Sequence, residues 1–177
     1  VVKLFPEITI KSKPVRKQLI AQLRKNIRRV VRNFDDGAEV RSTWDRIDVY
    51  TSEQGELRAE EVVDALSRVA GIANFLVVKE QPFIDLEDAS NRLIEAKKDK
   101  LKGKRYVVRV KRVGNHDFTS FEAERKFGGA LLANVESDGV DLHNPDETVR
   151  VEIRKDRLYI VDRHVQGLGG YPVGSLD

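Results

Sequence analysis

The hydrophobic positions in the first 80 residues follow two different spacings. From Pro14, whose ring suits the first turn of a helix, apolar residues recur every three or four positions as far as Phe34, where Asp35-Asp36-Gly37 ends the pattern. Gly71 closes a second helical stretch, and the segments between are short and apolar or alternate apolar with polar residues. The expected elements are strands over 1–5, 38–43, 44–51 and 72–78 and helices over 14–34 and 58–70. This β-α-β-β-α-β order is the ferredoxin-like split motif, in which two helices cover one face of an antiparallel sheet.

A second domain is expected after Pro82, because the elements that follow have a different order. They are a helix over 86–101, a strand over 104–113, a helix over 119–135 and strands over 148–154 and 157–163. The glycine-rich segment over 167–174 precedes no helix and is typical of an exposed linker. The predicted fold is therefore α+β, with a ferredoxin-like domain over 1–80, an α/β domain over 81–165 and a linker over 166–177.

Composition excludes several classes of protein. No apolar run approaches the roughly 18 residues of a membrane span, and no stretch resembles a signal peptide, so we expect a soluble, cytoplasmic protein without membrane contact. The absence of Cys removes thiolate zinc ligands and thiol nucleophiles, and His116, His143 and His164 lack metal-ligand spacing. We therefore predict no metal site and no bound cofactor within these 177 residues, and any enzyme among them would need carboxylate or Ser chemistry.

Charge is distributed unevenly, although the net charge is only +3. Residues 1–34 carry a net charge of +9 and residues 100–116 a net charge of +7, so the remainder of the chain sums to −13. Two basic segments in an otherwise acidic chain indicate a surface that binds a polyanion such as a nucleic acid. The alternative is a solvated helix face and a Lys-rich loop without a ligand.

The basic helix over 14–34 carries cations on every side that its apolar stripe leaves exposed. We expect this helix to lie along a phosphate backbone, although the sequence does not decide which face meets the ligand. The candidate contact residues are Lys17, Arg24, Arg28 and Arg32. Trp44, which follows the next strand, is assigned to packing.

The second basic segment includes the strand over 104–113, in which apolar and basic residues alternate so that the cations project mainly from one face. Arg109, Lys111 and Arg112 are the best candidates for phosphate contact, since Arg can bind two phosphate oxygens at once. Surface solubility is the alternative role. His116 and Phe118 follow in the turn and are candidates to stack on an unpaired base, while a core position is an equally good assignment for Phe118.

Thr119-Ser120-Phe121-Glu122 has the S/T-x-x-E pattern of a capping box and opens the next helix. The free N–H groups at such a helix start can bind phosphate, which makes Thr119 and Ser120 candidate RNA contacts, with Arg125 one turn further along. The same residues occur in purely structural helix starts, and we favour that structural role.

Short motifs along the whole chain resemble one known family. Lys3-Leu4-Phe5-Pro6-Glu7-Ile8-Thr9-Ile10-Lys11-Ser12 is similar to the opening of the 4-thiouridine synthetase (thiamine-pathway sulfurtransferase) family, and Arg109-Val110-Lys111-Arg112-x-Gly114-x-His116-x-Phe118 is similar to its THUMP domain. Asn144-Pro145-Asp146 and the segment from Gly167 to Gly174 match later landmarks in the same order.

This resemblance implies a ferredoxin-like domain and a THUMP domain that together bind tRNA at its acceptor 3′ end. In the family a further ATP-pyrophosphatase domain, with ATP and magnesium, activates the uridine at position eight, and a cysteine desulfurase supplies sulfur, possibly through a sulfur-carrier protein. A role in thiamine synthesis and a homodimer belong to the same set of expectations. The family's S-G-G-x-D-S nucleotide loop is missing here and there is no Cys, so we expect no thiolation by these residues alone.

Two alternatives keep part of this interpretation. THUMP domains also precede methyltransferases, deaminases and pseudouridine synthases, so the same RNA-binding residues are compatible with another modifying enzyme. A ferredoxin-like domain that binds a protein or a small ligand, with incidental basic runs, is the other alternative, because this fold serves many functions.

Overall fold

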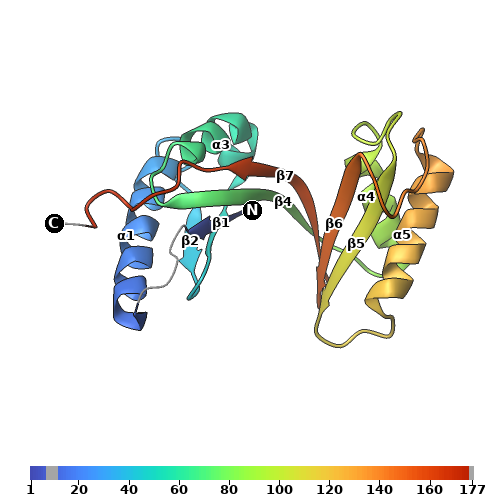
Figure 1. The fold of residues 1–177 in the computed structure, drawn as a ribbon, viewed down its shortest axis with the longest axis horizontal. Coiled ribbons are helices and arrows are strands. Elements are labelled where there is room, and N and C mark those ends of the chain that lie inside the picture. Colours follow the sequence, from blue (N-terminus) through green and yellow to red (C-terminus); the bar gives the residue numbers. More distant parts are fainter. Residues whose placement is uncertain (7–11, 176–177) are drawn as a thin grey trace. The chain divides into compact units, whose positions relative to one another are not determined.

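A computed structural model describes residues 1–6 and 12–175 of the chain, which forms two compact units (Figure 1). The first unit comprises Val1–Val78 together with Asp162–Asp177, and the second comprises Lys79–Val161. The middle of the opening motif, residues 7–11, lies outside the described residues, as do residues 176 and 177. The chain passes from the first unit to the second between Val78 and Lys79.

The first unit has the predicted order of elements with one helix added. The observed bounds are β1 (Val2–Pro6), α1 (Lys13–Val31), β2 (Glu39–Ser42), β3 (Ile47–Tyr50), α2 (Glu53–Leu57), α3 (Ala59–Ser67) and β4 (Ile72–Pro82). The strands run in the order β2-β3-β1-β4, and each neighbouring pair is antiparallel. The ferredoxin-like prediction is therefore confirmed, while α2 was not predicted and β3 begins at Ile47 rather than Trp44.

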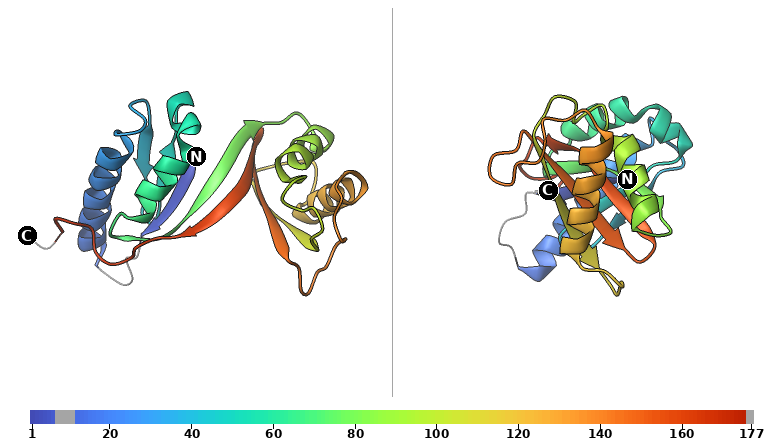
Figure 2. Two further views of the ribbon diagram at one scale, coloured as in Figure 1. Left: turned by 90° about the horizontal axis from the view of Figure 1, so that it is seen from above. Right: turned by 90° about the vertical axis from the view of Figure 1, so that its right-hand side faces the viewer.

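Two helices, α1 and α3, lie on the same side of these strands (Figures 1 and 2). The apolar stripe predicted for α1 supplies Leu23 and Ile27, α3 supplies Leu66, and the strands supply Ile47 and Phe75, none of which has accessible surface. Burial of such side chains stabilises each by about 1.5–3 kcal/mol relative to exposure. The cations of α1 consequently occupy the sides of the helix that face away from this core.

The predicted helix stop at Asp35 forms a buried polar centre. Its carboxylate has no accessible surface and accepts hydrogen bonds from the backbone N–H groups of Ser52 at 2.9 Å and Gly37 at 3.2 Å, and from the Ser52 hydroxyl. These bonds tie the end of α1 to the start of α2. Gly55 of α2 lies so close that a Cβ atom there would stand 2.1 Å from the Asp35 Oδ2 atom.

The second unit contains α4 (Leu86–Lys97), β5 (Tyr106–Val113), α5 (Ser120–Asn134), β6 (Glu147–Arg154) and the first half of β7 (Arg157–Gln166), whose residues from Asp162 on belong to the first unit. β5 and β6 are parallel and are connected by α5, whereas β6 and β7 form an antiparallel hairpin. Both helices pack on one side of the strands around a core that includes Tyr106, Phe127 and Ile153. The α/β prediction for this region is confirmed.

The segment after β7 packs within the first unit, where the sequence suggested an exposed linker. The N–H of Gly167 donates to the Ala73 carbonyl at 2.9 Å, and the N–H of Gly169 donates to the Ile72 carbonyl at 2.8 Å. Further along, the Val173 carbonyl accepts from the Asn26 side chain of α1 at 3.0 Å. Glycine permits this close approach, because a Cβ at Gly167 would lie 2.1 Å from the Ile72 carbonyl oxygen. The expected linker thus forms part of the first unit as far as residue 175.

We predict that Gly55→Ala destabilises the first unit. The added methyl group must displace the buried Asp35 carboxylate, and overpacking of this kind costs about 1–3 kcal/mol, more than the roughly 1 kcal/mol that Ala adds in helix propensity. Urea unfolding followed by the fluorescence of Trp44, which belongs to the first unit, measures the effect.

Gly129→Ala in α5 is the matched control, because no atom lies within 4 Å of a Cβ built there. This substitution should stabilise the second unit slightly, as seen by circular dichroism. Equal midpoints for Gly55→Ala and the unmodified chain would contradict the assignment of Asp35 as a rigid buried centre.

Candidate nucleic-acid interface

One face of the second unit's sheet presents cations to the solvent. Val108 and Val110 of β5 are buried in the core, so the intervening Arg109 and the following Lys111 project from the opposite face and are exposed. Arg150 of β6 is the register partner of Arg109 and is also exposed. Among the residues that the structure describes, none of these three cations forms an ion pair. We call Arg109, Lys111 and Arg150 the sheet-face cations.

Arg150 was not among the contact residues predicted from the sequence. The sequence contains the pattern that would identify it, because Arg150 lies between the buried residues Val149 and Val151 in the same alternation that identified Arg109. What the sequence did not contain was the parallel pairing of β5 with β6, which makes Arg109 and Arg150 direct neighbours.

Arg112 belongs to the other side of β5, in register with the buried Ile153. Its guanidinium turns toward the following loop, where Nη1 donates to the Gly114 carbonyl at 3.1 Å and approaches Nδ1 of His116 at 3.5 Å. The three residues predicted to contact phosphate therefore do not lie on one face of the strand. Arg109 and Lys111 lie together, and Arg112 supports the turn.

Arg105, at the start of the predicted basic strand, is neutralised within the unit. Its guanidinium donates to Asp146 at 3.2 Å and to Asp141 at 3.3 Å. The hydrogen bond from Arg105 holds the pKa of Asp146 below its usual value, while backbone N–H groups of Asn144 and His143 chiefly lower the pKa of Asp141. The segment over 100–116 thus offers less free positive charge than its composition indicates.

His116 and Phe118 line a pocket of about 430 Å³ beside the β6–β7 turn. Their ring centroids are 5.1 Å apart, and Nε2 of His116 lies 2.9 Å from the Lys155 carbonyl oxygen. Because a carbonyl only accepts, Nε2 carries the proton and Nδ1 is left to accept from Arg112. Phe118 is half-buried against the core, so its ring serves both the core and the pocket wall.

Thr119 and Glu122 form the predicted capping box at the start of α5. The Thr119 hydroxyl accepts from the Glu122 N–H at 3.1 Å, and the Glu122 carboxylate accepts from the Thr119 N–H at 2.6 Å. The latter bond lowers the pKa of Glu122. Ser120 is the first residue of α5, and Arg125 lies on its exposed side with its guanidinium 6.0 Å from the Phe121 ring centroid.

The cations of α1 form the second basic surface, which belongs to the first unit. Arg24 is half-buried, whereas Lys17, Arg28 and Arg32 are exposed. None of the Lys and Arg side chains of α1 forms an ion pair with a carboxylate in residues 1–6 or 12–175. Exposed cations of other elements do so, for example Arg68 with Asp64.

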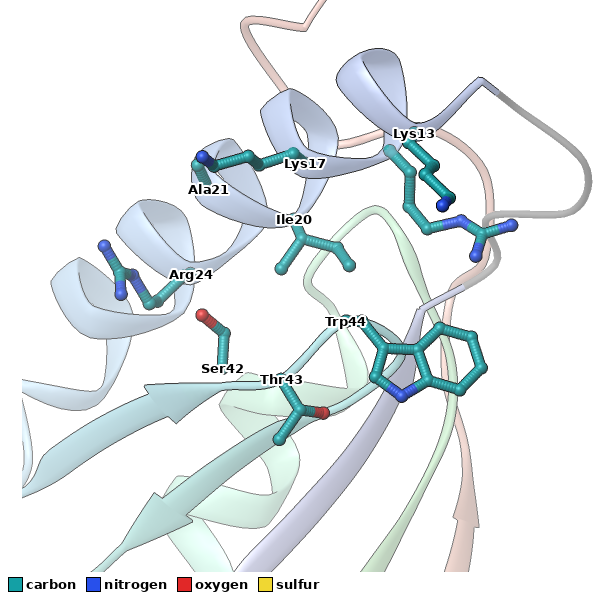
Figure 3. A pocket seen from close by; sticks show the side chains of 9 residues that line it. Lys13, Lys17, Ile20, Ala21, Arg24, Ser42, Thr43 and Trp44 are labelled. Atoms are coloured by element: carbon teal, nitrogen blue, oxygen red, sulfur yellow. The ribbon is translucent and has the colours of Figure 1, made fainter.

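Trp44 is exposed, so its assignment to packing was wrong. Its relative accessibility is 71%, because the residues before β3 form a turn that projects from the sheet beside α1. Together with Lys13, Arg16, Lys17, Ile20 and Arg24 it lines a pocket of about 550 Å³ (Figure 3). The Arg16 guanidinium lies 5.7 Å from the indole centroid.

The described residues were also searched for metal sites and for membrane-spanning helices. They contain no group of three or more His, Asp or Glu side chains placed to hold a metal ion. The same residues include no helix that is long and apolar enough to cross a membrane.

Comparison with known proteins assigns both units. The family model described as the ThiI ferredoxin-like domain matches residues 2–75, and the THUMP domain model matches residues 81–161. The chain belongs to the ThiI-like family. The tRNA sulfurtransferases of Shewanella woodyi and Pseudomonas aeruginosa are 45% and 44% identical to this ThiI-like chain over 177 residues. These matches cover 100% of the chain but only 37% of each relative, so the chain spans little more than a third of their length.

Two solved structures share this arrangement of elements. A 4-thiouridine synthetase in complex with RNA and ATP has a TM-score of 0.76 and 28% identity, and covers 98% of this chain and 43% of its own. PH1313 from Pyrococcus horikoshii has a TM-score of 0.73 and 26% identity, over 98% of this chain and 57% of its own. The resemblance inferred from short motifs is thereby confirmed.

We predict that Thr119→Ala lowers the stability of the second unit by about 1 kcal/mol, the usual cost of losing a helix cap. Because both capping bonds are internal to α5, RNA affinity should not change. Thr119→Ser restores the hydroxyl and should restore the stability measured by urea unfolding. A loss of RNA affinity at unchanged stability would instead assign Thr119 to the interface.

Proposed function

We propose that this ThiI-like chain binds tRNA through two surfaces, the cations of α1 in the first unit and the sheet-face cations in the second. The RNA segment it holds is the single-stranded 3′ end of the acceptor, and this grip presents the uridine at position eight to the enzyme's catalytic domain. The observation that carries the proposal is the absence of acidic partners for these two sets of cations within the described residues.

Uncompensated cations at these positions are unfavourable unless a ligand supplies negative charge. Arg109 and Arg150 are directly opposite each other on neighbouring strands, where like charges destabilise a sheet. Arg24 and Arg28 of α1 and its C-cap residue Arg32 follow one another at intervals of four residues, and each such like-charged pair costs about 0.2–0.5 kcal/mol. A phosphate backbone offsets both repulsions and releases counterions.

The relatives support RNA as the source of that charge. The matching curated proteins are named tRNA sulfurtransferases, and a solved 4-thiouridine synthetase with the same fold is a complex with RNA. For the whole protein we propose the corresponding activity, the ATP- and magnesium-dependent formation of 4-thiouridine with sulfur from a cysteine desulfurase. A sulfur-carrier protein, a contribution to thiamine synthesis and a homodimer extend the same proposal.

We predict that the chain binds unfractionated tRNA with an affinity that falls as salt rises, and that trimming the single-stranded 3′ end weakens binding. Fluorescence anisotropy of both RNAs over a salt series measures this. Equal affinity for intact and trimmed tRNA would contradict acceptor-end recognition. No binding of either RNA at low salt would contradict the proposed function itself.

We further predict that Arg109→Ala and Arg150→Ala each weaken tRNA binding across sequences and reduce the slope of log affinity against log salt by about 1 per lost phosphate contact. Lys102→Ala is the matched control in the same unit, because Lys102 is exposed but already lies 3.6 Å from the Glu136 carboxylate. A control slope that falls as much as the variant slopes would show that net charge, rather than the sheet face, governs binding.

A further inference from the structure

The pocket between α1 and the β2–β3 turn combines an exposed aromatic ring with clustered cations. Trp44 forms the wall on the turn, and Ile20, 6% exposed, forms an apolar floor below α1 (Figure 3). Lys13, Lys17 and Arg24 line the side formed by the helix. The pocket volume of about 550 Å³ lies in the range of about 300–1,000 Å³ that small ligands occupy.

One cation of this pocket, Arg16, lies beside the aromatic ring. Its Nε atom is buried and has no hydrogen-bond partner in the described residues, while its guanidinium lies over the Trp44 ring. Burying a donor without a partner costs about 1–3 kcal/mol unless a ligand supplies an acceptor. The side chain is therefore placed to meet an acceptor near the indole.

The positive charges around the pocket favour a negatively charged ligand. No Asp or Glu among the described residues lines it. Asp45 lines a small adjoining cavity and accepts a hydrogen bond from the Thr43 hydroxyl at 3.0 Å. A planar group on the indole with negative charge beside it fits this combination. Unpaired nucleotides have that chemistry, because every base has a stacking face and every nucleotide carries a phosphate.

We propose that this pocket holds one unpaired nucleotide of the bound RNA, with its base stacked on Trp44 and its flanking phosphates bound by Lys13, Lys17 and Arg24. The inference rests on the proposed function, since the nucleotide belongs to the same RNA. It adds a contact specific for single strands to the phosphate contacts along α1. The Arg16 guanidinium continues the stack or binds a base or phosphate oxygen.

Trp44 is the only Trp in the chain, so its fluorescence reports on this pocket alone. The experiment titrates the unmodified chain with a short single-stranded oligoribonucleotide, a blunt-ended RNA duplex and a mononucleotide, while anisotropy of labelled RNA measures total binding. We expect saturable quenching by the single strand and none by the duplex. Quenching by the mononucleotide at the same concentrations would overturn the assignment to RNA and identify a free-nucleotide site.

Trp44→Ala should weaken single-strand binding by about 5-fold or more, the loss expected for one base–aromatic stack, and Trp44→Phe should restore most of it. Because the Trp44 side chain is exposed, its removal should leave the fold intact, and circular dichroism of each variant checks this. Lys17→Ala and Arg68→Ala each remove one positive charge from the first unit, but Arg68 already pairs with Asp64 and only Lys17 lines the pocket, so only Lys17→Ala should reduce the quenching amplitude at a fixed RNA concentration.

The two proposals fail in different ways. Salt-dependent RNA binding without Trp quenching, and with unchanged affinity in Trp44→Ala, would overturn the pocket and leave the proposed function intact. Absence of any RNA binding would overturn both.

Discussion

One-sided burial is the constraint on which the rest of this structure depends, because α1 and α3 in the first unit, and α4 and α5 in the second, pack on one side of the strands. In β5 this makes Val108 and Val110 core residues and leaves Arg109 between them in solvent. In α1 it fixes Leu23 and Ile27 in the core, so the cations can only occupy the flanks of the helix. The positions of both candidate RNA surfaces therefore follow from the hydrophobic pattern, before any charge is considered.

Carboxylates then decide which cations remain available. Arg105 is bound by Asp141 and Asp146, and Arg163 is bound by Glu60, so these guanidinium groups are already neutralised by the protein. Glu152, beside Lys111 in register, pairs with Arg154. The sheet-face cations and those of α1 receive no such partner within the described residues. This selective pairing explains why the two surfaces keep positive charge that is not neutralised, in a chain in which basic and acidic residues are almost balanced.

The sequence predicted the fold well because periodic burial is a local signal. The apolar stripe of α1, the capping box at Thr119 and the alternation along β5 each lie within one element, and the observed elements match them closely. Bounds were less well predicted where a contact far along the chain sets them. β4 continues to Pro82, and residues 167–175 join the first unit through backbone hydrogen bonds to Ile72 and Ala73.

The candidate site could be predicted only in part, for the same reason. Arg105 looked as available as Arg109, since its acidic partners lie 36 and 41 positions further along the chain. Arg112 was grouped with its neighbours on the strand although the pleat directs it to the other face, and Trp44 looked like a core residue because large aromatic residues usually are buried. The assignments of Arg105 and Trp44 depend on which segment lies opposite, and a single sequence does not specify that.

The charges of α1 are also placed against the helix's own electrostatics, which bears on what they are for. Helices favour acidic residues in the first turn, and α3, α4 and α5 have them. α1 has none, and instead carries Lys13 and Arg16 at that end, without a side-chain hydrogen bond from its N-cap residue. Its stability must therefore come from burial of its apolar stripe, and the cations near its start add to the positive field of the helix dipole. A bound phosphate reverses this penalty, since the dipole and the side chains then act on the anion together. In the proposed complex with RNA, the unfavourable start of α1 therefore becomes favourable.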